Sequence, residues 1–232
     1  MTAPADHGRY IGVGLVLVSL CLLLLAWPVF WSALAASSAD HIDRQVALRR
    51  DIGDGQIGAY LYSRQVAVDR WASAENLSDL SVAQGMKAMS QDPIDRALLG
   101  QSMETTELVL QRRGVDPAAW LRMAALSRAL DADDAQAVVY LRRAMETGAQ
   151  SARLRSALAK QGLVLWRKLT PQDRASVMLA LEVAWQYESY QRADILRLAQ
   201  RQGLNALLDI ALAGNDHSTE RLNRLRARTG AN

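Results

Sequence analysis

The pattern of apolar and polar positions divides the chain into one unbroken apolar run and a long amphipathic remainder. The run covers residues 11–31, IGVGLVLVSLCLLLLAWPVFW, and contains no charged residue. As a helix, these 21 residues would be about 31 Å long, which matches the hydrocarbon core of a bilayer. Tyr10 precedes the run, and Trp27 and Trp31 share a helix face near its other end. Aromatic rings of this kind suit the membrane interface, so we predict a single transmembrane helix with Tyr10, Trp27 and Trp31 at its two interfaces.

A removable signal peptide is the alternative interpretation of the same run. The sequence Ala33-Leu34-Ala35 resembles a small-residue cleavage site. The apolar run is longer than the roughly 7–15 residues of a secretory signal, however, and it contains Pro28 and two tryptophans near its end. We therefore expect an uncleaved anchor that occupies residues 1–37 together with its tail. Cys21 follows Leu20 where a lipoprotein would have a small residue, so it is interpreted as an apolar thiol within the helix.

The charges that flank the run give conflicting signals about orientation. Arg9 precedes it, whereas Arg44, Arg49 and Arg50 follow within the range over which the positive-inside bias is counted. Taken alone, this count favours a cytoplasmic domain. Long domains translocate largely regardless of charge, and the small-residue stretch SALAASSA is typical of exported proteins. We predict a single-pass protein of the bacterial inner membrane whose soluble domain is periplasmic.

Residues 38–58 are expected to connect the anchor to the domain. The polar segment 40–51 is predicted to be a helical stalk that lifts the domain off the membrane. The segment DIGDGQIG that follows contains three glycines and is predicted to be a hinge loop. Asp51 and Asp54 lie in this loop but lack the further oxygen ligands and closing glutamate of a calcium loop, so no metal site is predicted.

Residues 59–232 show helical spacing throughout and no alternating strand signal, which predicts an all-α domain. Helices are expected over 60–74 and 78–90, the second with an apolar face of Val82, Met86 and Met89. Asp92-Pro93, Asp116-Pro117 and Thr170-Pro171 each place a capping residue before a proline, which predicts three helix starts. Gly203 is expected to end a helix. Because the links are short, neighbouring helices are predicted to form antiparallel hairpins.

One segment resembles a known repeat. In DPAAWLRMAALSRALDADDAQAVVYLRRAMETG, the tryptophan, the Met-Ala pair and the serine occupy the first-helix positions of a tetratricopeptide repeat, and three later residues match its second helix. The turn is one residue longer than the consensus, and the terminal proline is absent. The resemblance implies an α-solenoid. The matched residues are Trp120, Met123, Ala124, Ser127, Ala137, Leu141 and Ala144.

The stretch from Leu154 to Leu204 is similar in character to small anchored helical-repeat proteins of bacterial envelope polysaccharide systems. That similarity implies an accessory role beside polymerases or export machinery. It carries no functional residues over to this chain, so the surface that would bind a partner is not predicted.

The residues contain no pattern of catalytic chemistry. His7, His41 and His217 have no partner at metal-ligand spacing, and no nucleophile or phosphate-loop motif occurs. Asp131, Asp133 and Asp134 fall in a turn, and Glu182 and Glu188 are too far apart on one helix to act as a pair. The basic C-terminal run of Arg221, Arg224, Arg226 and Arg228 lacks any nucleic-acid motif. No cofactor, metal, nucleic acid or small-molecule ligand is predicted.

Two functions remain open. The first is a membrane-anchored adaptor, not an enzyme, that holds a membrane protein or complex of the cell envelope on its helical surface. Polysaccharide biosynthesis or export is the process in which we expect that partner to act. The second is an envelope enzyme that acts on glycans through scattered carboxylates outside any motif. We favour the adaptor, because catalysis normally requires a positioned nucleophile, base or metal set.

Overall fold

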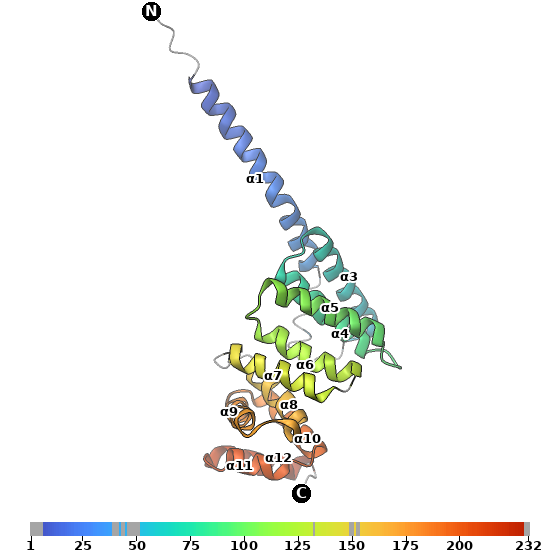
Figure 1. The fold of residues 1–232 in the computed structure, drawn as a ribbon, viewed down its shortest axis with the longest axis vertical. Coiled ribbons are helices and arrows are strands. Elements are labelled where there is room, and N and C mark those ends of the chain that lie inside the picture. The colour runs from blue at the N-terminus through green and yellow to red at the C-terminus, as the bar shows by residue number, and fades with distance from the viewer. Residues whose placement is uncertain are drawn as a thin grey trace, which may run out of the picture. The chain divides into compact units, whose positions relative to one another are not determined.

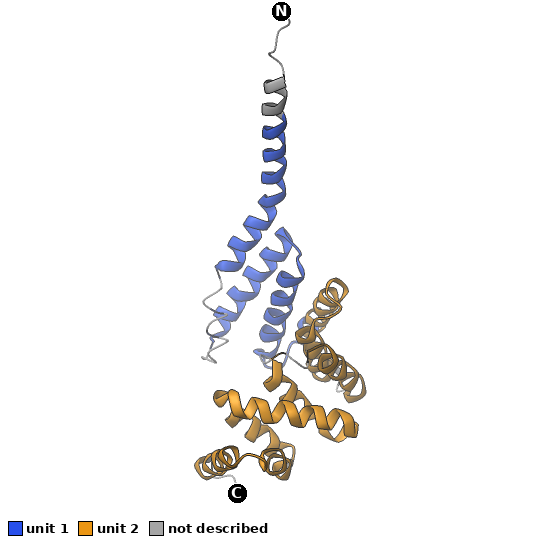
Figure 2. Ribbon diagram, turned by 90° about the vertical axis from the view of Figure 1, so that its left-hand side faces the viewer, with its two compact units in different colours: residues 1–98 blue, residues 99–232 orange. Residues whose placement is uncertain are grey.

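The computed structural model describes residues 7–38, 42, 45, 52–131, 133–148, 151 and 154–229, with side chains from Gly14 onward and without that of Asp131. Every regular element among these residues is helical, as predicted, and no strand occurs among them. The chain divides into two compact units, residues 1–98 and 99–232 (Figure 2). This boundary differs from the predicted ones, which separated an anchor, a connector and a single helical domain.

Unit 1 contains three of the described helices: α1 (His7–Ser37), α3 (Asp54–Arg70) and α4 (Ala74–Met89). The C-terminal end of α1 lies alongside α3, and α4 packs on α3 in turn (Figure 1). Ile42 is buried with Tyr60 and Ala83 in the core of this unit. Ile42 belongs to the segment 40–51 predicted to be a polar stalk, so at this position the segment contributes to the core. Most of residues 40–51 lie outside the described residues.

The glycine-rich segment 51–58 is largely helical rather than a hinge loop. Helix α3 begins at Asp54 and includes Gly55 and Gly58, so the prediction of a hinge loop is wrong for 54–58. Each helical glycine costs about 1 kcal/mol relative to alanine. Burial of Ile57 and Tyr60 on the same helix offsets this cost. The apolar face predicted for the next helix is also partly wrong, because Met89 is 63% exposed while Leu77 and Leu80 are buried.

The boundary between the units falls within α5 (Arg96–Arg112), and unit 2 contains the helices that follow it. The remaining elements are α6 (Pro117–Asp131), α7 (Asp134–Gly148), α8 (Arg155–Leu165), η2 (Trp166–Lys168), α9 (Pro171–Tyr187), η3 (Ser189–Gln191), α10 (Arg192–Arg201), α11 (Asn205–Leu212) and α12 (Asp216–Thr229).

Local capping chemistry sets several helix starts. Asp116 accepts a hydrogen bond from the Ala119 N–H at 3.0 Å and Thr170 accepts one from the Asp173 N–H at 3.2 Å, so both predicted starts are confirmed. Asp173 in turn completes a capping box with Thr170. The third predicted start is wrong, because Asp95 rather than Asp92 caps α5, accepting from the Leu98 N–H at 3.0 Å.

The predicted stop at Gly203 is confirmed. Gly203 has φ of 67°, and its N–H donates to the Gln200 carbonyl at 3.0 Å. The Leu204 N–H donates to the Ala199 carbonyl at 2.8 Å, which completes a Schellman motif. A left-handed backbone at this position favours glycine.

Small residues let the hairpins of unit 2 pack closely. Gly148 at the end of α7 lies against Pro117 at the start of α6, so that a Cβ atom on Gly148 would come within 2.4 Å of the Pro117 Cβ. Gly162 on α8 lies against Val177 on α9 at similarly close range. Residues of the repeat-like segment pack as expected: Ala124, Ala137, Leu141 and Ala144 are fully buried.

We predict that Gly162→Ala lowers the free energy of unfolding by about 2 kcal/mol, because a methyl group would overlap Val177 in the α8–α9 contact. Thermal unfolding of the full chain in detergent, followed by circular dichroism, measures the change. Gly100→Ala is the control, since nothing lies within 4 Å of a Cβ atom there. That variant should be neutral or slightly stabilising.

The same pair allows a double-mutant cycle. Gly162→Ala combined with Val177→Ala should cost less than the sum of the two single changes, because the smaller side chain leaves room for the methyl group. If the losses in free energy of unfolding of the two single variants simply add in the double variant, the close contact between Gly162 and Val177 is contradicted.

Candidate functional site

Helix α1 presents an apolar surface to its surroundings over most of its length. From Gly14 to Ser37 it is 24 residues long and apolar enough to cross a membrane. Leu15, Leu20 and Leu25 are 64%, 53% and 71% exposed, so no part of the described chain covers this stretch. A continuous exposed apolar surface of this kind suits an apolar environment such as a bilayer.

Aromatic rings gather where this apolar stretch ends. Trp27 and Trp31 lie edge to face with ring centroids 5.6 Å apart, and Phe30 packs on Trp31 at 5.8 Å. Trp27 is 60% exposed and Trp31 38%. The structure thus brings two of the three predicted interface residues together, which suits a membrane–water boundary. The third, Tyr10, lies on α1, but its side chain is outside the described residues.

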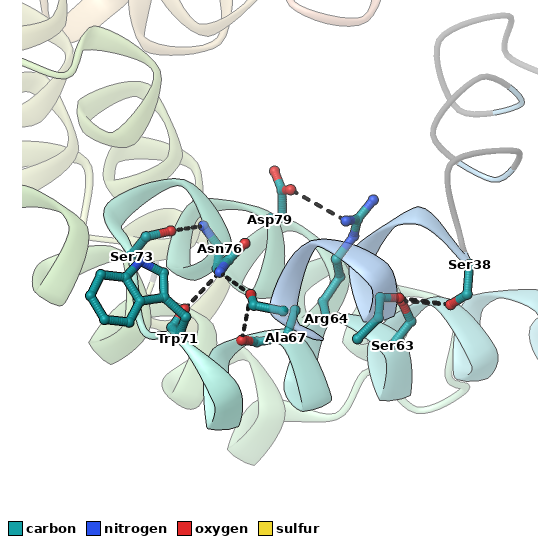
Figure 3. A network of polar contacts seen from close by, with 10 residues as sticks. Ser38, Ser63, Arg64, Ala67, Trp71, Ser73, Asn76 and Asp79 are labelled. Carbon is teal, nitrogen blue, oxygen red and sulfur yellow. Dashed lines mark hydrogen bonds and ion pairs between the residues drawn. The ribbon is translucent and has the colours of Figure 1, made fainter. Parts of the chain in front are cut away.

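Directly beyond the aromatic rings, α1 is tied to α3 and α4 by polar contacts (Figure 3). The Ser32 hydroxyl is 2% exposed and donates to the Ala67 carbonyl at 2.9 Å. The Asn76 amide donates to Ser32 Oγ at 2.7 Å and to the Trp71 carbonyl at 2.6 Å. Ser63 donates to the Ala35 carbonyl at 2.7 Å. Small hydroxyl side chains allow the two helix backbones to approach closely, as in helix pairs within membranes.

Arg64 lies beside these contacts and is 3% exposed. Its guanidinium is 4.9 Å from the centre of the Tyr60 ring, and its Nη1 is 3.6 Å from Asp79 Oδ2. A buried arginine is stable only when its charge is paired, so this ion pair joins α3 to α4 at the base of the anchor.

Unit 2 contains a second candidate site, a cleft between α7 and α9. It has a volume of about 760 Å³ and is lined by Arg142, Met145, Glu146, Ser176 and residues 170–173. A smaller apolar pocket of about 320 Å³ adjoins it, and Met145 and Ser176 line both. Leu179, which lines the smaller pocket, is 64% exposed. Sequence spacing could not identify this cleft, because its residues come from separate helices.

An ion pair fixes the polar wall of the cleft. Arg142 donates from Nη2 to Asp173 Oδ2 at 2.8 Å and from Nε to Oδ1 at 3.2 Å. These hydrogen bonds, helped by Thr170, lower the pKa of the Asp173 carboxyl against the opposing effect of burial. Asp173 thus has two roles, since it also completes the capping box of α9.

Several of the residues weighed for chemistry make ordinary structural contacts. Asp133 caps α7 by accepting from the Gln136 N–H, and Asp134 pairs with Arg128. Arg226 pairs with Asp209 and Arg224 with Glu220, so the basic C-terminal run is partly neutralised. Within the described part of the chain, no group of three or more His, Cys, Asp and Glu side chains could hold a metal ion.

We predict that Ser32→Ala loosens the docking of α1 on α3, because it removes the donor to Ala67 and the acceptor for Asn76. The α3 amides from Ala67 to Trp71 should exchange with deuterium about tenfold faster, which corresponds to about 1.4 kcal/mol. Hydrogen exchange of the full chain in lipid nanodiscs measures this. Ser37→Ala, which removes an exposed bond within α1, is the control and should leave exchange unchanged.

We predict that Asp173→Asn destabilises unit 2 by about 1 kcal/mol at pH 7, because it removes the charged partner of Arg142. Since the folded pKa of Asp173 is lowered, this stabilisation is fully present above the ordinary carboxyl pKa of 3.8 and is lost as pH falls through the folded value. Thermal unfolding of both forms between pH 7 and pH 3 tests this. Glu220→Gln, an exposed pair, should show no such pH dependence. A difference that stays constant with pH would contradict the assignment.

Comparisons with protein-family models, with curated proteins and with solved structures found no match to this chain.

Proposed function

We propose that this protein is a membrane-anchored helical adaptor that binds a membrane protein or complex of the bacterial cell envelope. In this proposal α1 crosses the inner membrane once, the helical units lie on the periplasmic side, and the partner acts in polysaccharide biosynthesis or export. The observation that carries the proposal is the continuity of α1: its exposed apolar stretch leads within one turn into buried contacts with α3.

This continuity favours a retained anchor over a cleaved signal. Cleavage after Ala35 would remove the Ser32 hydroxyl from the Ala67 carbonyl and from the Asn76 amide. It would also expose the faces of α3 and α4 that α1 covers. Buried polar groups that lose their partners cost about 1–3 kcal/mol each, so unit 1 would be weakened by cleavage.

The arrangement of unit 2 supports a solenoid-like adaptor of the tetratricopeptide kind. Helices α6 and α7 form an antiparallel hairpin, and α8 packs on both of them. Helix α8 then pairs with α9, while α10 packs on α8 and α11 on α9. Successive hairpins stacked in this way leave helix faces available for partner proteins.

The cleft between α7 and α9 is the surface we assign to the partner. Exposed Leu179 and the adjoining Met145 provide an apolar contact, and Arg142, Glu146 and Arg155 surround them with charge. An apolar centre with a charged rim is the usual anatomy of a protein interface. The occupant is a short segment of the partner protein that carries a bulky apolar side chain.

We predict that Leu179→Glu reduces partner capture more than tenfold, because a charge at the centre of the apolar contact opposes its burial. The full chain, tagged at its C-terminus, is purified from membranes in mild detergent after cross-linking in cells, and its partners are quantified by mass spectrometry. Ile210→Glu is the matched control, since Ile210 is a similarly exposed apolar residue on α11.

A partner retained in stoichiometric amounts by the native chain and by the Ile210→Glu variant, but not by Leu179→Glu, supports the proposal. Equal capture of the partner by all three forms would show that the cleft is not the surface that binds it. A chain that emerges alone in every form would contradict the adaptor. Protease added to intact spheroplasts tests the orientation, and digestion of the C-terminal tag is expected.

A further inference from the structure

The corner between α3 and α4 lies beside the part of α1 where the exposed apolar stretch ends and the buried contacts begin. Contacts between α1 and α3 pair Ser32 with Ala67 and Ala35 with Ser63, so the two helices run antiparallel. Helix α3 therefore runs back toward the apolar stretch of α1. In Figure 2, α1 extends from the same end of unit 1 at which α3 turns into α4.

The register of this pair gives the height of the corner. Ala67 is level with Ser32, and Arg70 and Trp71 follow it by three and four residues. At 1.5 Å per residue, they lie about 5 Å further toward the membrane, level with Pro28 and Val29 of α1. A cleft of about 450 Å³ agrees with this placement, since Val29 and Trp71 both line it.

The corner has the side chains of a membrane interface. Trp71 is 47% exposed, and Arg70 beside it is also exposed. On α1, Leu34 is 49% exposed two residues beyond Ser32, so the apolar surface continues past the height of the corner. A tryptophan and an arginine at this height match the residues that anchor membrane proteins among lipid headgroups.

We propose that the α3–α4 corner, residues 70–73, is a second membrane contact, in which Trp71 inserts among the lipid headgroups and Arg70 binds lipid phosphates. The inference rests on the proposed membrane anchor. With Trp27 and Trp31 on α1, Trp71 forms one aromatic belt contributed by two helices. Unit 1 is thereby held against the membrane at two points, which fixes its tilt.

The test uses an environment-sensitive fluorophore on single cysteines in the full chain, reconstituted into vesicles of phosphatidylcholine and phosphatidylglycerol. Cys21→Ser removes the native thiol, and Ala72→Cys places the probe in the corner while keeping Trp71. Tyr62→Cys is the control, because Tyr62 is 73% exposed on α3 and lies about 13 Å further from the membrane at 1.5 Å per residue. A probe on native Cys21 reports independently whether α1 lies in the bilayer.

We expect a headgroup nitroxide on phosphatidylcholine to quench the Ala72→Cys probe at least about threefold more than the Tyr62→Cys probe. Aqueous iodide should show the opposite order. Adding Trp71→Ser should bring the quenching at position 72 close to that at position 62.

Two other results distinguish a failure of the second membrane contact from a failure of the proposed membrane anchor. A water-exposed probe at position 72 together with a bilayer-embedded probe at Cys21 would overturn the second contact and leave the anchor intact. A water-exposed probe at Cys21 would overturn the anchor itself and the second contact with it. Unchanged quenching at position 72 after Trp71→Ser would also contradict the proposal.

Discussion

The hydroxyl of Ser32 is the contact on which the architecture of unit 1 depends. It donates to a carbonyl of α3 and accepts from an amide of α4, one residue after the aromatic rings that end the apolar stretch. Both partners lie close to the expected edge of the bilayer, where water competes less for hydrogen bonds than at an open surface. One short side chain therefore connects the apolar helix α1 to both helices that pack around its C-terminal end.

The described helices of unit 2 are held together in a different way, by close contacts between helices at small residues. Gly148 and Gly162 allow Pro117 and Val177 to lie where a methyl group would otherwise be. Such contacts tolerate little change in volume, because a packed interior resists both cavities and overlap. The hairpins are thus fixed by shape, and the Arg142–Asp173 pair adds a charged tie between α7 and α9 at the edge of the cleft.

The features that could be predicted from the sequence are those decided within one or two helical turns. The caps at Asp116 and Thr170, the stop at Gly203 and the buried stripe of Ala137, Leu141 and Ala144 follow from local chemistry and spacing. The docking of α1 could not be predicted, since Ser32 and Ser63 give no periodic signal. Their partners, Ala67 and Ala35, lie 35 and 28 residues away along the chain. The hinge loop predicted for the glycine-rich segment is wrong for a related reason. Burial of Ile57 against other helices outweighs the helical cost of Gly55 and Gly58.

Hydrogen bonds at the base of the anchor give specificity that an apolar contact would lack. A leucine-lined face on α3 could bury as much area against α1, but it would fit any apolar helix in many registers. Ser32 and Ser63 each require a particular backbone carbonyl on the facing helix, and Asn76 donates to the Ser32 hydroxyl. A shift of α1 by one residue would therefore leave buried polar groups without partners. The register determined in this way is also what sets the height of Trp71 relative to Val29. The position of the α3–α4 corner along α1 is therefore fixed by directed hydrogen bonds rather than by the amount of buried apolar area alone.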